Sequence, residues 1–445
     1  MLSYIDSYWA KIIYSPKESR GNAHTIPLPH TFISTNEKSS SHWKGALFYW
    51  DSFFMFRGLI GTNREWIMPG MVDNFIYLLR KYGIIPNANF WGFLVSSQPP
   101  FLSSMLFDAY YAIQRGGIIR KTLTKPYAVL WLRHRIKYVQ QEYWQVWEDT
   151  TWYNHKVEAY GLSRYGDRDV GYQWNAERES GWDFTTRFYN RCHEFLPIDL
   201  NSYLHKYERD FAKAANILRR KKEQAFWENR AHERAEKIKN LMWNEKAGFF
   251  FDYDFFNKAQ SDFYSLAGFV PMWAKLATYD QAKKMREKLP LFETDYGLTI
   301  TAKISHPKSF DLQSIPPAFK RSIEELLAPK QWDYPNIWSP LEYLTVIGLL
   351  RYGCVDDAVR IMKKSVATQT KIFDKYGYLF EKIDGQNGDI PKTFWYKPQI
   401  GFGWTNAITY RYIEILDYIN KTDGNIYQDQ PNLHEPPYSL TSMLH

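Results

Sequence analysis

The apolar residues of this chain recur at helical spacing through long segments, and the alternation typical of strands is scarce. Residues spaced i, i+3 and i+4 share one face of a helix, and that apolar face must pack against another element. The segments with this spacing are 52–60, 65–83, 101–115, 126–142, 202–240, 263–289, 321–329, 339–351, 355–371 and 404–420. Two of them, 65–83 and 339–351, run into an aromatic residue followed by glycine, which readily ends a helix in the left-handed conformation. The sequence therefore predicts an all-α fold.

Segments rich in aromatic residues, glycine and proline separate the expected helices. They lie at 48–53, 86–93, 96–100, 179–184, 331–338 and 400–406. Helices that alternate with such segments are typical of a closed ring of helix pairs, in which one set of loops meets at a central pocket. No low-complexity linker splits the chain, so we expect an N-terminal arm or lid at 1–40, a single helical domain at 41–423 and an irregular tail at 424–445.

The charge balance does not point to nucleic acid. The 445 residues include 56 Lys and Arg against 48 Asp and Glu, a net charge of +8 that is spread along the chain. The densest basic run, RRKK at 219–222, lies among Glu and Ala and indicates a solvated helix face. The N-terminus lacks the pattern of a signal peptide, and no run of about 18 apolar residues occurs. We therefore expect a cytoplasmic protein that binds neither nucleic acid nor a membrane.

Motifs for metals, nucleotides and nucleophilic serine are absent from the sequence. Cys192 and Cys354 form no C-x-x-C pair, no H-E-x-x-H occurs, and no phosphate-binding G-x-x-x-x-G-K-[ST] loop is present. His155 and His193 are expected to be structural, because the 11 histidines are scattered. No cofactor and no metal are expected.

Acidic residues beside tryptophan are the main chemical signal, in a chain whose 80 aromatic residues suit the stacking of sugar rings. The pairs are Trp50–Asp51, Trp182–Asp183 and Trp332–Asp333. A carboxyl group packed against indole loses solvation, so its pKa rises and it suits general acid catalysis near pH 7. A helix N-cap after a core tryptophan is the structural alternative for each pair. Glu381 is a candidate second acid, and two carboxyl groups on either side of a glycosidic bond favour a carbohydrate enzyme.

At these residues the sequence resembles the trehalases of glycoside hydrolase family 37 and, more distantly, the α-glucosidases and mannosylglycerate hydrolases of family 63. Several segments in order carry the resemblance: FYWDSFFMFRGL (48–59), IIPNANFWGFLVSSQPPFLSSM (84–105), RESGWDFTTRF (178–188), PIDLNSYL (197–204), QWDYPNIWSP (331–340), FEKID (380–384) and QIGFGWTN (399–406). The similarity spans about residues 40–410.

This resemblance implies a fold and a mechanism. The family's fold is a ring of six helix pairs, an (α/α)6 toroid, and its members invert the anomeric carbon without a cofactor or a metal. By position, Asp183 is the expected general acid and Glu381 the expected general base. The two carboxyl groups of an inverting glycosidase stand roughly 6.5–9.5 Å apart, which leaves room for a water.

The resemblance also implies a set of substrate-binding residues for a small carbohydrate. The positions that contact the cleaved sugar are occupied by Trp50, Asp51, Asn87, Gln98 and Gly181. Arg164 stands where a family arginine reaches toward the leaving sugar. Further candidates, which either contact the sugar or support the pocket wall, are Glu179, Trp332 and Trp404.

Three departures from the family pattern fall on the leaving-group side. SSHWKGA (40–46) places Trp43 near an expected arginine, Ser96 replaces the arginine before S-Q-P-P, and Trp395 stands opposite a family glutamate. Arginine holds sugar hydroxyls with several donors at once, so these changes should alter the second subsite. We expect the Trp43 and Trp395 rings to narrow that part of the pocket.

Three functions follow from this pattern. The leading hypothesis is inverting hydrolysis of trehalose to two glucoses. A second is hydrolysis of another small glycoside, such as mannosylglycerate or glucosylglycerate, with Arg164 and Lys392 meeting the carboxylate. A third is a catalytically silent sugar-binding protein, which the presence of both Asp183 and Glu381 argues against.

Overall fold

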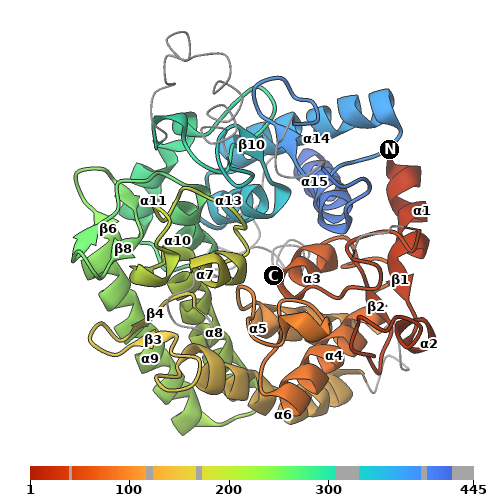
Figure 1. The fold of residues 1–445 in the computed structure, drawn as a ribbon, viewed down its shortest axis with the longest axis horizontal. Helices are drawn as coiled ribbons and strands as arrows, with labels where there is room; N and C mark the ends of the chain where they lie inside the picture. Colours follow the sequence, from red (N-terminus) through yellow and green to blue (C-terminus); the bar gives the residue numbers. More distant parts are fainter. Residues whose placement is uncertain (40–42, 117–123, 167–172, 306–329, 392–397, 423–445) are drawn as a thin grey trace, which may run out of the picture.

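The computed structural model describes residues 1–39, 43–116, 124–166, 173–305, 330–391 and 398–422. Figure 1 shows helices arranged around a ring, and the chain runs once around it in sequence order. The last helix, α15 (Gly403–Lys421), packs against α3 (Tyr49–Phe56) and α1 (Leu2–Ile12), so the two ends of the ring meet. The predicted all-α fold is confirmed.

The long helices of the ring pack against their neighbours in sequence, as α4 does against α5 and α13 against α14. These helices are α4 (Ile67–Tyr82), α5 (Leu102–Arg115), α6 (Thr124–Glu142), α8 (Ile198–Ile217), α9 (Lys221–Met242), α13 (Ser339–Arg351) and α14 (Val355–Tyr376). The shorter helices are α2 (Pro16–Ser19), α7 (Gln173–Glu179), α10 (Val270–Trp273) and α11 (Tyr279–Arg286). Gly83 and Gly377 end α4 and α14 in the left-handed conformation, which confirms the glycine stop predicted after α4.

The single helix predicted at 202–240 is wrong. The chain forms two helices there, α8 and α9, which reverse direction at Arg219, where φ is +59°. The apolar spacing continues across the break because each helix buries one face against the other. Arg219 and Arg220 are exposed at the turn, as the prediction of a solvated basic run requires.

The single helix predicted at 263–289 is also wrong. A 3-10 turn at Leu266–Phe269 is followed by α10 and then by α11. Pro271 lies in the first turn of α10, and Thr278 with Gln281 forms a capping box that starts α11. Both signals are present in the sequence and indicate separate short helices.

The strands are two residues long and lie in the connections between helices. They are β1 (Ile13–Tyr14), β2 (Phe32–Ile33), β3 (Lys156–Val157), β4 (Leu162–Ser163), β5 (Phe195–Leu196), β6 (Trp243–Asn244), β7 (Phe249–Phe250), β8 (Tyr253–Asp254), β9 (Ala259–Gln260), β10 (Asn336–Ile337) and β11 (Ile383–Asp384). β10 pairs antiparallel with β11, with Asn336 opposite Asp384 and Ile337 opposite Ile383. This pairing places the segment 331–338 beside Glu381.

The N-terminal segment contributes to the core. Ile5, Tyr8, Trp9 and Ile12 of α1 are buried, and α1 packs against α15. β1 pairs with β2, which fastens the following loop to the end of α1. Helix α1 is thus packed against the ring, while the description of residues 1–40 as a separate arm or lid stays a prediction.

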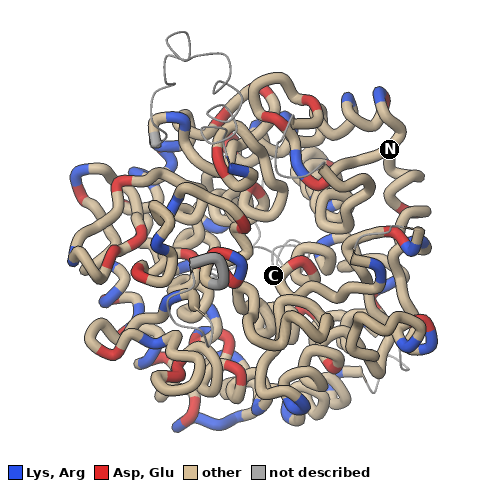
Figure 2. Tube along the Cα trace, viewed as in Figure 1, with Lys and Arg blue, Asp and Glu red and all other residues tan. Residues whose placement is uncertain are grey.

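Figure 2 shows Lys and Arg residues interspersed with Asp and Glu residues along the chain. None of the described helices is both long enough and apolar enough to cross a bilayer. The helix predicted at 321–329 and the tail predicted at 424–445 lie outside the described residues.

Candidate active site

Five buried tryptophans from distant parts of the chain form one cluster. They are Trp50, Trp182, Trp332, Trp338 and Trp404, each no more than 3% exposed. The rings of Trp332 and Trp338 stack with centroids 3.9 Å apart and an interplanar angle of 7°. Trp332 also lies 5.6 Å from Trp50 and 5.6 Å from Trp182. The cluster therefore brings together the segments that carry the predicted site residues.

Gly181 lets the chain pass directly under this cluster. Its φ is +73°, and a Cβ atom there would lie 2.7 Å from the Trp50 ring. Any other residue would force the indole or the loop to move. The prediction placed Gly181 at the sugar site, and the structure puts it in contact with Trp50.

The first turn of α3 carries Trp50 and Asp51, so the helix begins at Tyr49 and not at residue 52 as predicted. Every residue of α3 is buried, because this helix forms the inner wall of the ring. The backbone N–H of Trp50 donates to Gln98 Oε1 over 3.1 Å. Two predicted sugar-binding side chains, Trp50 and Gln98, are thereby held together.

Asn87 connects helix α3 to the segment that precedes Asp183. The backbone N–H of Tyr49 donates to the Asn87 carbonyl over 3.0 Å, and Asn87 Nδ2 donates to the Arg178 carbonyl over 3.4 Å. Both Asn87 and Gln98 are buried. The loop 84–98 is therefore anchored to α3 on one side and to the end of α7 on the other.

Asp183 has the electrostatics of a general acid. Burial raises its pKa to about 7; the Arg178 guanidinium opposes this rise, while the charges of Glu177 and Glu381 add to it. Its Oδ1 atom is buried without a hydrogen-bond partner among the described residues. The group is therefore protonated for much of the time at neutral pH and has an oxygen available for a substrate.

Asp51 is the third carboxyl group of the site. Burial raises its pKa well above the ordinary value, and the charges of Glu381 and Asp183 raise it further, against a backbone hydrogen bond that lowers it. Asp51, Asp183 and Glu381 are thus close enough to influence one another's ionisation, although about 130 and 200 residues separate them along the chain.

Glu381 is placed by the start of α15. Its backbone N–H donates to the Gln399 carbonyl over 3.0 Å, and its own carbonyl accepts from Trp404 Nε1 over 3.3 Å. The residue is 4% exposed, and Lys382 Nζ lies 3.9 Å from Glu381 Oε2. Trp404 therefore both closes the aromatic cluster and holds the backbone of Glu381.

In the third Trp–Asp pair, Trp332–Asp333, the aspartate has a structural role. Asp333 accepts hydrogen bonds from Thr185 Oγ1 over 2.9 Å and from the backbone N–H of Thr186 over 3.0 Å. These two residues directly follow the segment of Asp183. Asp333 therefore holds the loop that carries the general acid.

Glu179 is engaged by the protein on both carboxylate oxygens. It accepts from the backbone N–H of Ser97 over 2.9 Å, from that of Gly166 over 2.8 Å and from His155 Nε2 over 2.8 Å. Glu179 thus joins three loops around the site, which is the supporting arrangement considered for it. His155 is buried in the same network, in keeping with its predicted structural role.

Arg164 is directed to neighbouring loops. Its Nε donates to the Asn154 carbonyl over 3.1 Å, its Nη1 donates to the His193 carbonyl over 2.9 Å, and its guanidinium lies over the Phe255 ring. None of these partners belongs to the tryptophan cluster. The predicted contact of Arg164 with a leaving group stays a prediction.

Trp43 is 40% exposed and packs against Phe90 and Phe93, with centroids 5.5 and 5.6 Å away. The Arg178 guanidinium lies 5.7 Å from the centroid of Phe93, which links Trp43 to the surroundings of Asp183. Trp43 also lines a cavity of about 680 Å³ together with Tyr14 and Phe90. Trp395 and Lys392 lie outside the described residues.

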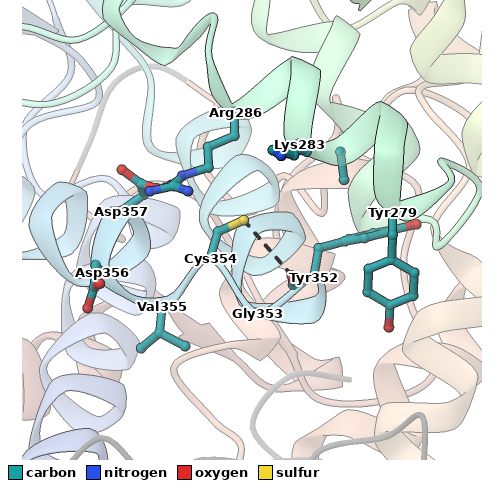
Figure 3. A pocket seen from close by; sticks show the side chains of 10 residues that line it. Tyr279, Lys283, Arg286, Tyr352, Gly353, Cys354, Val355, Asp356 and Asp357 are labelled. Carbon is teal, nitrogen blue, oxygen red and sulfur yellow. Dashed lines mark hydrogen bonds and ion pairs between the residues drawn. The ribbon is translucent and has the colours of Figure 1, made fainter.

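Another cavity, of about 290 Å³, lies between α11 and the start of α14 (Figure 3). Arg286 and Asp357 form an ion pair in its wall, and Cys354 lies beside them. It shares no residue with the tryptophan cluster, and we assign it no part in the reaction. Within the described parts of the chain, no three His, Cys, Asp or Glu side chains are grouped so that they would hold a metal.

Several supporting residues were not anticipated from the sequence. Arg187 is fully buried, forms ion pairs with Asp199 and Asp252, and lies over the Trp182 ring at 4.5 Å. Its position in the segment 178–188 was visible, but its partners follow from the tertiary fold. Arg178 and Lys382 were likewise missed, because only the structure brings their charges close to Asp183 and Glu381.

A ring of helices, with two carboxyl groups beside the buried tryptophan cluster, defines a glycoside hydrolase of the (α/α)6 type. Solved structures agree. The chain is similar to neutral trehalase Nth1 from Saccharomyces cerevisiae, with a TM-score of 0.69 and 30% identity over 85% of this chain and 72% of that one. The family 63 mannosylglycerate hydrolase from Thermus thermophilus shares the fold, with a TM-score of 0.61 at 14% identity over 93% of this chain and 99% of that one.

Sequence comparison identifies the family. The family model described as Trehalase matches residues 6–420. The periplasmic trehalase of Xanthomonas campestris pv. campestris is 28% identical over 91% of this chain and 72% of its own length. The cytosolic neutral trehalase of Saccharomyces cerevisiae is 31% identical over 84% of this chain and 55% of its own length. The chain belongs to the trehalase family.

Proposed function

We propose that this chain hydrolyses trehalose to two molecules of glucose with inversion at the cleaved anomeric carbon. The observation that carries the proposal is the pairing of Asp183, whose pKa burial raises to about 7, with Glu381 beside the tryptophan cluster. An acid that holds its proton near pH 7 and a second carboxylate within electrostatic range are the two groups that this reaction needs. Membership of the trehalase family supports the choice of substrate.

In the proposed mechanism, Asp183 donates its proton to the glycosidic oxygen as the bond to the anomeric carbon breaks. Glu381 takes a proton from a water that attacks the same carbon from the opposite face. Atoms and charge balance, because Asp183 ends ionised and Glu381 ends protonated. The roughly 6.5–9.5 Å separation of the two carboxyl groups stays a prediction of this mechanism.

The sugar that is cleaved is held by the buried polar groups above the tryptophans. We assign Asp51 to accept hydrogen bonds from sugar hydroxyls, and Trp50 to pack against the ring. Gln98 Oε1 already accepts from the Trp50 backbone, so its amide Nε2 is the group assigned to the substrate. Asn87 and Gly181 complete this subsite, and Trp332 and Trp404 support its wall.

The other two functions have weaker support. Recognition of a glycerate carboxylate was assigned to Arg164 and Lys392. Lys392 lies outside the described residues, and the Arg164 guanidinium donates to the carbonyls of Asn154 and His193. A silent sugar-binding protein does not need a buried acid with a pKa near neutrality beside a second carboxylate. The relatives from Xanthomonas campestris and Saccharomyces cerevisiae are named as trehalases, which favours neither alternative.

We also propose one catalytic domain, residues 41–423, with 1–40 as an arm packed on it, and a cytoplasmic location. Cys192 and Cys354 are both free thiols, which suits a reducing compartment. The relatives include periplasmic and cytosolic enzymes, so cell fractionation is the test of location. A small carbohydrate is the expected partner, and nucleic acid and membranes are not.

The test of function is glucose release from trehalose, with glucosylglycerate and mannosylglycerate as competing substrates. Proton NMR during the first turnovers should show β-glucose from the cleaved residue and α-glucose from the leaving one. Asp183→Asn and Glu381→Gln serve as matched inactive variants. Faster cleavage of either glycerate glycoside, or full turnover in either variant, would overturn the proposal.

A further inference from the structure

Lys382 places a buried ammonium group next to Glu381 and within electrostatic range of Asp183, the two carboxyl groups of the proposed mechanism. The residue is 1% exposed, and its Nζ lies 3.9 Å from Glu381 Oε2. Asp183 is also within range, because its charge and that of Glu381 both act on Lys382. Burying a lysine costs free energy unless its charge is paired with an opposite charge. The burial of Lys382 beside two carboxyl groups therefore indicates a function in the site.

The ammonium group is held in place by the segment 331–338. Lys382 Nζ donates to Gln331 Oε1 over 3.1 Å and lies 4.8 Å from the centroid of the Trp338 ring. The backbone carbonyl of Gln331 accepts hydrogen bonds from Trp338 Nε1 over 2.8 Å and from Asn336 Nδ2 over 3.1 Å. Because β10 and β11 pair, this framework and Lys382 form one unit.

The charged groups around Glu381 differ from those around Asp183. Glu381 faces Lys382, Asp183 and Asp51, whereas Asp183 faces Arg178, Glu177, Glu381 and Lys382. Of the two carboxyl groups, Glu381 is the stronger influence on Lys382. Burial lowers the pKa of Lys382 to about 8 while these two carboxylates oppose the change, so the group remains a cation at neutral pH.

We propose that Lys382 is a positioning residue that determines which carboxyl group carries the proton: it keeps Glu381 ionised while Asp183 stays protonated. The inference rests on the proposed function. An opposite charge within about 4–6 Å favours an ionised carboxyl group by roughly 1–3 pH units. During the reaction the proton moves off Asp183 and another moves onto Glu381, so Lys382 faces one carboxylate before and after the step.

The test compares pH profiles of kcat/KM in three variants. Lys382→Gln removes the charge but keeps a donor for Gln331, Lys382→Met removes both, and Lys382→Arg keeps the charge. Lys206→Met is the matched control, because Lys206 is a lysine of α8, mostly shielded from solvent and paired with a carboxylate, that lies outside the site.

We expect the acidic limb of the profile to move up by at least about one pH unit in Lys382→Gln and Lys382→Met. At pH values well below the limb of the parent, this corresponds to a loss of about tenfold or more in kcat/KM, with KM changed much less. Lys382→Arg should restore the limb, and Lys206→Met should leave it in place even where its melting temperature falls. A limb that stays in place in folded Lys382→Gln would overturn the proposal.

A second measurement does not depend on the substrate. Carbon-13 NMR of labelled glutamate, with Glu381→Gln to identify the signal, follows the ionisation of Glu381 directly. The signal should titrate at least about one pH unit higher in Lys382→Gln than in the parent protein. An unchanged titration refutes the role of Lys382, whereas absence of trehalose turnover in the parent refutes the proposed function alone.

Discussion

Replacing Asp183 with asparagine tests the electrostatics of the site through stability as well as through activity. Burial raises the pKa of Asp183 from 3.8 to about 7, so the folded protein binds this proton more tightly than the unfolded chain does. The stabilisation from the bound proton is fully present below about pH 4 and is lost as the pH rises to about 7. Above that pH the folded protein must hold a buried carboxylate.

Asparagine has nearly the same shape and no charge to bury. Each pKa unit corresponds to about 1.4 kcal/mol, so a rise of about three units sets a limit of about 4 kcal/mol. The free energy of unfolding of Asp183→Asn relative to the parent should therefore increase between pH 4.5 and 7 and level off above pH 7. The variant should gain stability at pH 8 while it loses turnover.

Urea denaturation followed by tryptophan fluorescence at pH 4.5, 6, 7 and 8.5 measures this difference. Asp280→Asn, at an exposed position of α11, is the control and should show the same difference at every pH. If the advantage of Asp183→Asn were equal at pH 4.5 and 8.5, the carboxyl group would not be desolvated. The assignment of Asp183 as the general acid would then lose its physical basis.

Three further substitutions test the site. Glu381→Gln should lower kcat on the order of 10²- to 10⁴-fold. Calorimetry should find its affinity for trehalose within about threefold of the parent. Strongly weakened binding would make Glu381 a binding residue. Gly181→Ala should lower the melting temperature and reduce kcat/KM by on the order of 10- to 100-fold, because the new Cβ would lie 2.7 Å from the Trp50 ring. Wild-type kinetics would show that the ring can move without consequence. Trp43→Ala should raise KM for trehalose by roughly tenfold with little change in kcat, as expected for a lost stacking contact of about 1.4 kcal/mol. An unchanged KM would show that Trp43 does not contribute to the leaving-group subsite.

The helices that were predicted well are those whose signals are local. Helix α4 ends at Gly83 because glycine adopts the left-handed conformation at no cost, and this is visible in the sequence. The break between α8 and α9 falls at Arg219, whose positive φ carries no such mark. In the structure, the helices on either side of this break pack against each other.

The site divides in the same way. The sequence alone determined that the chain forms a ring of amphipathic helices and that acids stand beside tryptophans at its loops, because periodicity and adjacency are properties of neighbouring residues. Only the tertiary structure decided that Asp183 is desolvated, that Asp333 holds its loop and that Lys382 lies against Glu381. Burial and Coulomb interactions depend on distance through space, and folding brings together groups that are about 200 residues apart in the chain.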